Sequence, residues 1–297
     1  MEISNLKREI KQPMPRQVDQ SPDRGQFCPM PRRTVLSLAL LALLAASALA
    51  GPPIARFRSV LGEFDVLLDP PAAPISVVNF ASYANRGAYD NSIIHRSTTG
   101  NPLDIQIVQG GGFELVLNTL VAIEPDPPIP LEAGQPNQRG TLAMARTTAP
   151  DSATSQWYFN VTDNPGLDFN YAVFGRVLGT GVSVVDAIGE VTVYNASAIL
   201  GPTFTQLPLF SGNLQPQNLV LIDSVRVEPF AITNLTRGSN AVEIRWTALS
   251  TNTPVRVERT GNLGGGSWTV VSSNNTGGFF RDTNAPSGSA FYRVVTE

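Results

Sequence analysis

Glycine and proline occur so often in this chain that few segments are long enough to form an extended helix. The sequence of 297 residues contains 25 Gly and 24 Pro. Both residues interrupt helices and sheets, and both are typical of turns. The runs between them are short, and several alternate apolar with polar residues, as a half-buried strand does. We therefore predict a mainly β protein built from short strands.

Two strands and two helices can be placed from local patterns. Ile54–Val60 alternates in polarity, and Phe64–Leu68 continues as a second strand after a turn, which predicts a hairpin. In Pro74–Ala84 a proline suits the first helical turn, and apolar residues recur at the spacing of one helix face. A second short helix is predicted over Val182–Ile188, which lies between two glycines.

The ionisable residues exclude several classes of function. The formal net charge is −3, which argues against a nucleic acid as the main partner. The chain contains one Cys and one His, too few for a disulfide framework, a Cys-rich zinc site or a three-His zinc site. We therefore expect neither a metal nor a cofactor.

The N-terminal region has the three parts of a secretory signal peptide. Arg32 and Arg33 precede the apolar stretch Val35–Ala50, which ends in the small-x-small triplet Ala48-Leu49-Ala50. A helix of this length covers about 24 Å, less than the roughly 30 Å of a hydrocarbon core. We predict cleavage between Ala50 and Gly51 and a periplasmic or secreted protein with no stable membrane span. A membrane anchor formed by residues 35–50 is the alternative, and the sequence leaves open whether Met1 or Met30 is the true start.

Six short motifs follow one another between residues 89 and 177. In chain order they are Tyr89–Arg96, Val108–Phe113, Arg139–Ala145, Ser155–Asn160, Leu167–Asp168 and Tyr171–Val177. This ordered set resembles the cyclophilin family over residues 54–228. The resemblance implies a closed eight-stranded antiparallel barrel capped by two helices. It also implies a monomeric peptidyl-prolyl cis/trans isomerase that acts on proline-containing polypeptides, and an exported isomerase would assist the folding of exported proteins.

The resemblance assigns a catalytic role to Arg96 and a structural role to its neighbour His95. The C–N bond of the peptide has partial double-bond character, so uncatalysed rotation has a barrier of about 18–20 kcal/mol. An Arg that donates a hydrogen bond to the prolyl nitrogen or the adjacent carbonyl holds the twisted amide better than the planar one. A surface ion pair is the alternative role for Arg96.

Eight further positions match residues that contact the peptide in the family. These substrate-binding candidates are Gln109, Ile107, Met144, Ala145, Gln156, Tyr158, Leu167 and Tyr171. The two glutamines correspond to residues that hold the substrate backbone, and the apolar members correspond to the pocket that receives the proline ring. For Met144, Tyr158 and Leu167, ordinary core packing is the alternative.

The sequence departs from the family near these positions. An insertion within Ser97–Asp104 lengthens the segment before Gln109, while Gln106 and Gly166 stand where aromatic residues are typical. Two lost aromatic contacts would remove of order 1–3 kcal/mol of proline-ring binding. Arg146 stands where Asn is common. The alternative function is therefore a proline-peptide-binding or envelope scaffold protein with a degenerate pocket and no catalysis.

The composition shifts toward Thr, Asn, Ser and Gly after residue 228. Short strand-like runs separated by turn signals predict a small β-sandwich over residues 229–297, with a weak resemblance to fibronectin type III modules. We therefore divide the chain into residues 1–50, 51–228 and 229–297. Attachment or spacing is the expected role of the last unit, which we predict to be dispensable for the barrel, and carbohydrate binding by Trp268 and Phe280 is the alternative.

Overall fold

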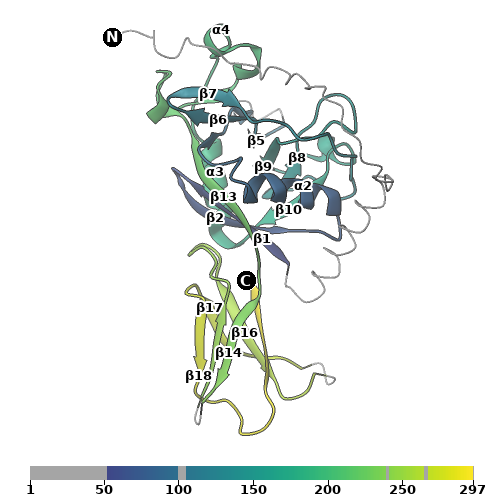
Figure 1. Ribbon diagram of the computed structural model, residues 1–297, viewed down its shortest axis with the longest axis vertical. Coiled ribbons are helices and arrows are strands. Elements are labelled where there is room, and N and C mark those ends of the chain that lie inside the picture. The colour runs from purple at the N-terminus through teal and green to yellow at the C-terminus, as the bar shows by residue number, and fades with distance from the viewer. Residues whose placement is uncertain (1–51, 100–104, 239–240, 264–266, 297) are drawn as a thin grey trace, which may run out of the picture.

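The computed structural model describes residues 52–99, 105–238, 241–263 and 267–296. The predicted signal peptide and most of the Ser97–Asp104 insertion lie outside the described residues. Helices and one large sheet form the upper part of the molecule, and strands alone form the lower part (Figure 1). Within the described ranges, no helix combines the length and the apolar character that crossing a membrane requires.

In its described residues the upper part contains thirteen strands, three α-helices and several single 3₁₀ turns. The strands are β1 (Pro53–Ser59), β2 (Gly62–Leu68), β3 (Ser92–Ile93), β4 (Arg96–Ser97), β5 (Ile107–Gly110), β6 (Phe113–Val116), β7 (Thr119–Ala122), β8 (Thr141–Met144), β9 (Trp157–Asn160), β10 (Val173–Val177), β11 (Val193–Tyr194), β12 (Leu207–Pro208) and β13 (Leu221–Pro229). The helices are α2 (Pro74–Asn85), α3 (Val182–Gly189) and α4 (Ser197–Leu200). The predicted hairpin and both predicted helices are present.

Eleven of these strands form one antiparallel sheet. Its order is β4-β5-β9-β8-β10-β2-β1-β13-β3-β6-β7. Among the described residues, β4 and β7 are the two edge strands of this sheet, and they do not pair with each other. The sheet therefore differs from the closed eight-stranded barrel that we predicted. Its edge matters for function, because β4 carries Arg96.

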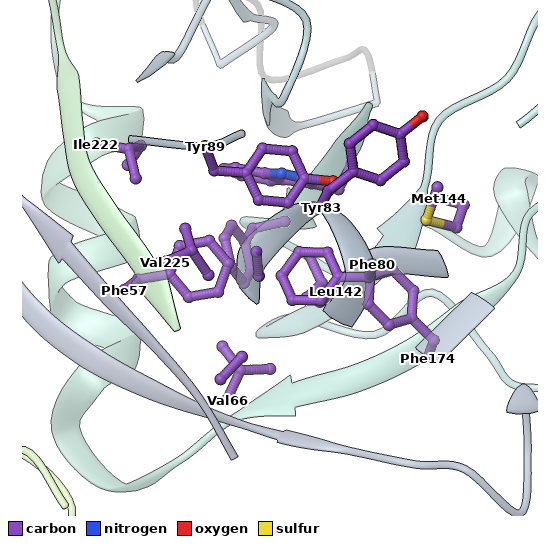
Figure 2. Close-up of a cluster of buried hydrophobic side chains, with 14 of the residues drawn as sticks. Phe57, Val66, Phe80, Tyr83, Tyr89, Leu142, Met144, Phe174, Ile222 and Val225 are labelled. Atoms are coloured by element: carbon purple, nitrogen blue, oxygen red, sulfur yellow. The ribbon is translucent and has the colours of Figure 1, made fainter. Parts of the chain in front are cut away.

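An aromatic cluster fills the inside of the curled sheet (Figure 2). The Phe57 ring stacks on Phe64 with centroids 5.0 Å apart, and the edge of Trp157 meets Phe57 at 5.2 Å. Helix α2 closes one side with Phe80 and Tyr83, both fully buried. The Glu132 carboxylate accepts hydrogen bonds from the amides of Ile75 (3.0 Å) and Ser76 (2.7 Å), which caps the N-terminus of α2.

The lower part consists of two three-stranded sheets, β14-β15-β18 and β17-β16-β19. Their strands are β14 (Ile232–Arg237), β15 (Val242–Trp246), β16 (Val255–Thr260), β17 (Thr269–Asn275), β18 (Phe279–Asp282) and β19 (Phe291–Thr296). Both sheets contribute to one apolar cluster that includes Ile244 and Val257, and Phe280 packs against it. Arg293 lies over the Trp268 ring at 4.5 Å from its centroid. These contacts favour packing roles for both aromatic residues over a carbohydrate platform.

The two parts share a tight junction around Asp65 of β2. Its carboxylate is fully buried and accepts hydrogen bonds from Arg56 Nε at 3.1 Å and from the Ser250 amide at 2.5 Å. The side-chain amide of Asn252 donates to the Glu63 carbonyl at 2.8 Å. That residues 51–228 fold without the lower part stays a prediction, and truncation would remove the Ser250 donor from a buried carboxylate.

We predict that Arg56→Ala lowers the free energy of unfolding by about 2 kcal/mol. Among the described residues, it leaves the buried Asp65 carboxylate with the Ser250 amide as its one remaining hydrogen-bond donor. The matched control is Arg58→Ala on the same strand. Arg58 pairs with Glu63, and the two side chains are 54% and 47% exposed, so its loss should cost less than about 1 kcal/mol. Urea denaturation measures both variants, and equal losses would contradict this account.

Candidate active site

One pocket in the upper part brings together most of the residues that the sequence assigns to the site. Its volume is about 650 Å³, and it opens at the edge of the sheet formed by β4 and β5. Its lining comprises Arg96, Thr98, Ile105, Ile107, Gln109, Ala145, Arg146, Tyr158, Leu167, Tyr171 and Gln206. Seven of the nine predicted site residues are in this set; Met144 and Gln156 are not.

Arg96 is held by neutral partners. Strands β4 and β5 place it directly opposite Gln109, whose Oε1 accepts a hydrogen bond from Arg96 Nη1 at 3.2 Å. Gln109 Nε2 in turn donates to Gln156 Oε1 at 2.8 Å. Gln156 therefore acts on the pocket through Gln109 rather than by lining it. Burial lowers the pKa of Arg96, yet a guanidinium remains charged at neutral pH.

Gln206 is a site residue that the sequence analysis missed. Its Oε1 accepts a hydrogen bond from Arg96 Nε at 3.1 Å, and its backbone carbonyl accepts one from the Ser97 amide at 2.9 Å. Gln206 lies 110 residues from Arg96 in the sequence and outside all six motifs. No local pattern indicates this contact, which only the fold creates.

The apolar side of the pocket is a small cluster separate from the main core. It contains Ile107, Tyr158 and Leu167, with Ala145 and Tyr171 packed against it. The Tyr158 hydroxyl donates to Asn137 Oδ1 at 2.7 Å, which satisfies its buried polar end. Burial raises the pKa of Tyr158, so this hydroxyl keeps its proton. The arrangement offers a proline ring an apolar wall beside the Arg96 guanidinium.

The assignment of Met144 requires correction. Successive side chains of a strand point to opposite faces of the sheet. In β8, Ala143 packs with the pocket cluster, whereas Leu142 and Met144 join the main core. Figure 2 shows Met144 among the core residues. Met144 is 1% exposed and cannot contact a proline ring in the pocket, so the core-packing alternative describes it.

Of the departures from the family pattern, Arg146 lines this pocket, whereas Gln106 and Gly166 do not. Ile105, at the end of the insertion, lines the pocket. The Gln106 backbone is fixed by Asn164, which accepts from its amide and donates to its carbonyl, each at 3.0 Å. Gln106 lines a different groove. Gly166 is exposed, and no atom lies within 4 Å of where its Cβ would be. Arg146 also lines the pocket, and its guanidinium lies over the Tyr171 ring.

His95 is buried next to Arg96 and does not line the pocket. Its ring meets the Phe113 ring edge-on with centroids 5.3 Å apart. Burial, with a smaller contribution from the nearby Arg96 charge, lowers the pKa of His95 to about 4. The imidazole is therefore neutral at pH 7 and serves as a packed core group.

Comparisons with known proteins agree with these observations. The family model described as cyclophilin type peptidyl-prolyl cis-trans isomerase/CLD matches residues 55–203. Peptidyl-prolyl cis-trans isomerase A of Dickeya dadantii is 40% identical over 168 residues, which cover 54% of this chain and 84% of that protein. Peptidyl-prolyl cis-trans isomerase B of Escherichia coli is 44% identical over 126 residues, covering 39% of this chain and 71% of that protein.

A solved cyclophilin type isomerase of Cryptosporidium parvum, crystallised in the presence of the dipeptide Ala-Pro, covers 59% of this chain and 98% of its own with 18% identity and a TM-score of 0.43. The residues after 203 lie outside the family match. The extent of that match, together with the relatives at 40% and 44% identity, shows that this chain belongs to the cyclophilin family and is a peptidyl-prolyl cis-trans isomerase.

Proposed function

We propose that Arg96 drives isomerisation in this pocket by stabilising the twisted X-Pro amide. The observation that carries the proposal is the Arg96 guanidinium held by Gln109 and Gln206 beside the apolar wall. Both acceptors are neutral amide oxygens, so the positive charge is fixed in direction without being cancelled. A fixed donor binds the twisted transition state, in which charge develops, more strongly than it binds the planar ground state. That difference lowers the barrier.

The mechanism follows from what each group does to the substrate. The proline ring packs against Ile107, Tyr158 and Leu167, which anchors one side of the C–N bond. Rotation then separates the nitrogen lone pair from the carbonyl, and Arg96 donates a hydrogen bond to the nitrogen or the adjacent carbonyl as resonance is lost. The reaction transfers no proton and breaks no σ bond. It therefore needs no general acid or base, which is consistent with a neutral His95 and a protonated Tyr158.

We place the protein outside the cytoplasm, where it assists the folding of exported polypeptides. The basic residues before the apolar stretch Val35–Ala50 and the small residues at its end support export. Cleavage should leave Gly51 as the first residue, which N-terminal sequencing of the exported protein tests. An exported protein that retains residues 35–50 would instead favour the membrane anchor.

We expect the full chain to accelerate the refolding of a test protein whose slow phase is set by proline isomerisation. That phase takes about 10–100 s without catalyst at 25 °C. Its rate should rise in proportion to the concentration of this protein, and Arg96→Ala should abolish the effect. A slow phase that is unchanged by a large excess of the wild type would contradict a role in folding.

The competing proposal is a proline-peptide-binding scaffold without catalysis. Gln106 and Gly166 support it, because neither supplies the aromatic surface that the family pattern leads one to expect. Ile105 offers an aliphatic replacement on the same rim, and for this reason we favour catalysis. For the lower part of the molecule we propose attachment or spacing, with the Asp65 junction holding it to the isomerase part.

A further inference from the structure

The isomerase pocket carries two positive charges and no described negative one. Arg96 and Arg146 both line it, and its other lining residues are apolar or neutral. The chain as a whole, by contrast, has a net charge of −3, so its negative charges outnumber its positive ones. A cationic pocket in an acidic protein distinguishes among substrates by charge.

Arg146 is fixed in place without a carboxylate partner among the described residues. Its Nε donates to the Asn170 carbonyl at 2.7 Å, and its Nη1 donates to the carbonyls of Thr147 (2.9 Å) and Thr148 (3.3 Å). The guanidinium lies over the Tyr171 ring, 4.7 Å from the centroid. These partners orient the side chain and leave its charge uncompensated.

Among the described residues, Asp168 is an acidic residue that directly follows a lining residue, Leu167, in the sequence. Its Oδ1 accepts a hydrogen bond from the Asn137 amide at 2.6 Å, and Asp168 does not line the pocket. Among the described residues no ion pair joins Asp168 to Arg146, whose hydrogen bonds go to backbone carbonyls. Arg146 directly follows Ala145 at the end of β8, on the wall where the resemblance to the family places the backbone of the bound peptide.

We infer that Arg146 is a specificity-determining residue that makes this isomerase prefer proline preceded by Asp or Glu. The inference rests on the proposed function of the pocket. Arg96 and Arg146 line the same pocket as the apolar wall, so with the proline ring on that wall we expect the side chain before the proline to face both guanidinium groups. A carboxylate there meets two oriented guanidinium groups, whereas a Lys side chain meets like charge.

The test compares kcat/KM for the peptides Ala-Glu-Pro-Phe, Ala-Gln-Pro-Phe and Ala-Lys-Pro-Phe with the full chain. At low salt the Glu peptide should exceed the Gln peptide about three- to fivefold, as partly exposed charge pairs allow. The Lys peptide should be the slowest. The Glu preference should shrink at 1 M salt, where the Debye length is about 3 Å.

Arg146→Gln should bring the Glu-to-Gln ratio below about twofold. The matched control is Arg245→Gln in the lower part, because Arg245 also lies over a ring, at 4.6 Å from the Phe279 centroid; it should leave the ratio unchanged.

A wild type that turns over all three peptides equally would overturn this inference while leaving the isomerase function intact. Turnover of none of them would instead overturn the proposed function. If Arg146→Gln fails to fold, the wild-type ratios and their salt dependence still decide the inference.

Discussion

Replacing Arg96 with Ala should reduce kcat/KM for a proline tetrapeptide by about 10²–10³, which corresponds to roughly 3–4 kcal/mol of barrier. The loss arises because the variant keeps the apolar wall and loses the donor that favours the twisted amide. The fold should persist, since Arg96 is only half-buried at the pocket and has amide partners that can hydrate when it is removed. Circular dichroism checks the fold alongside the kinetics.

Arg96→Lys is the conservative variant, and it should recover little of this activity. Arg96 uses two separate nitrogens, Nε for Gln206 and Nη1 for Gln109. A single ammonium cannot satisfy both acceptors and still present a donor in the same direction. Full activity in Arg96→Ala would remove Arg96 from the mechanism, and full activity in Arg96→Lys would show that positive charge alone is sufficient.

The second large effect concerns pH and His95, the single histidine of the chain. Its pKa falls from about 6.5 in an unfolded chain to about 4 in the folded protein, because burial disfavours the imidazolium. Between these values the unfolded state binds the proton more tightly. The contribution to stability is therefore complete above pH 6.5 and is lost as the pH falls toward 4. Acidification from pH 7 to pH 5 should cost about 2 kcal/mol through this group.

His95→Gln isolates that contribution. Glutamine does not titrate, and the carboxylates that also protonate in this range are common to both proteins. The difference in unfolding free energy between the wild type and the variant should thus shift by about 2 kcal/mol between pH 7 and pH 5, as measured by urea denaturation at each pH. The variant should keep most of its isomerase activity at pH 7, because the reaction moves no proton. A pH-independent difference would contradict the buried neutral imidazole.

Sequence patterns predicted the elements whose signals are local. The helix expected over Pro74–Ala84 is observed over Pro74–Asn85, since its N-terminal proline and its apolar spacing both lie within the segment. The strand Ile232–Arg237 escaped prediction because five of its six side chains are exposed and show no alternation. The barrel closure implied by the family resemblance also differs, because which strands form the edges depends on long-range pairing.

For the site, the motifs predicted residues that share one pocket, and the errors have a physical cause. Met144 occupies a family motif, but the alternation along β8 turns it toward the core while its neighbours face the pocket. Gln206 reaches Arg96 from a distant segment without any motif of its own. In the sequence, Arg146 stood out only because Asn is common at its position. The structure adds that its partners are a backbone carbonyl and the Tyr171 ring, and the proposed preference for an acidic residue before proline rests on this.

The most direct test of the central claim is exchange NMR on one proline tetrapeptide mixed with a small amount of the full wild-type chain. Uncatalysed exchange between the cis and trans forms takes tens to hundreds of seconds at 25 °C. We predict that the exchange rate rises linearly with protein concentration and that an excess of a second proline peptide suppresses the rise. A peptide that binds the pocket while its exchange remains at the uncatalysed rate would contradict the account and identify the protein as a binding scaffold.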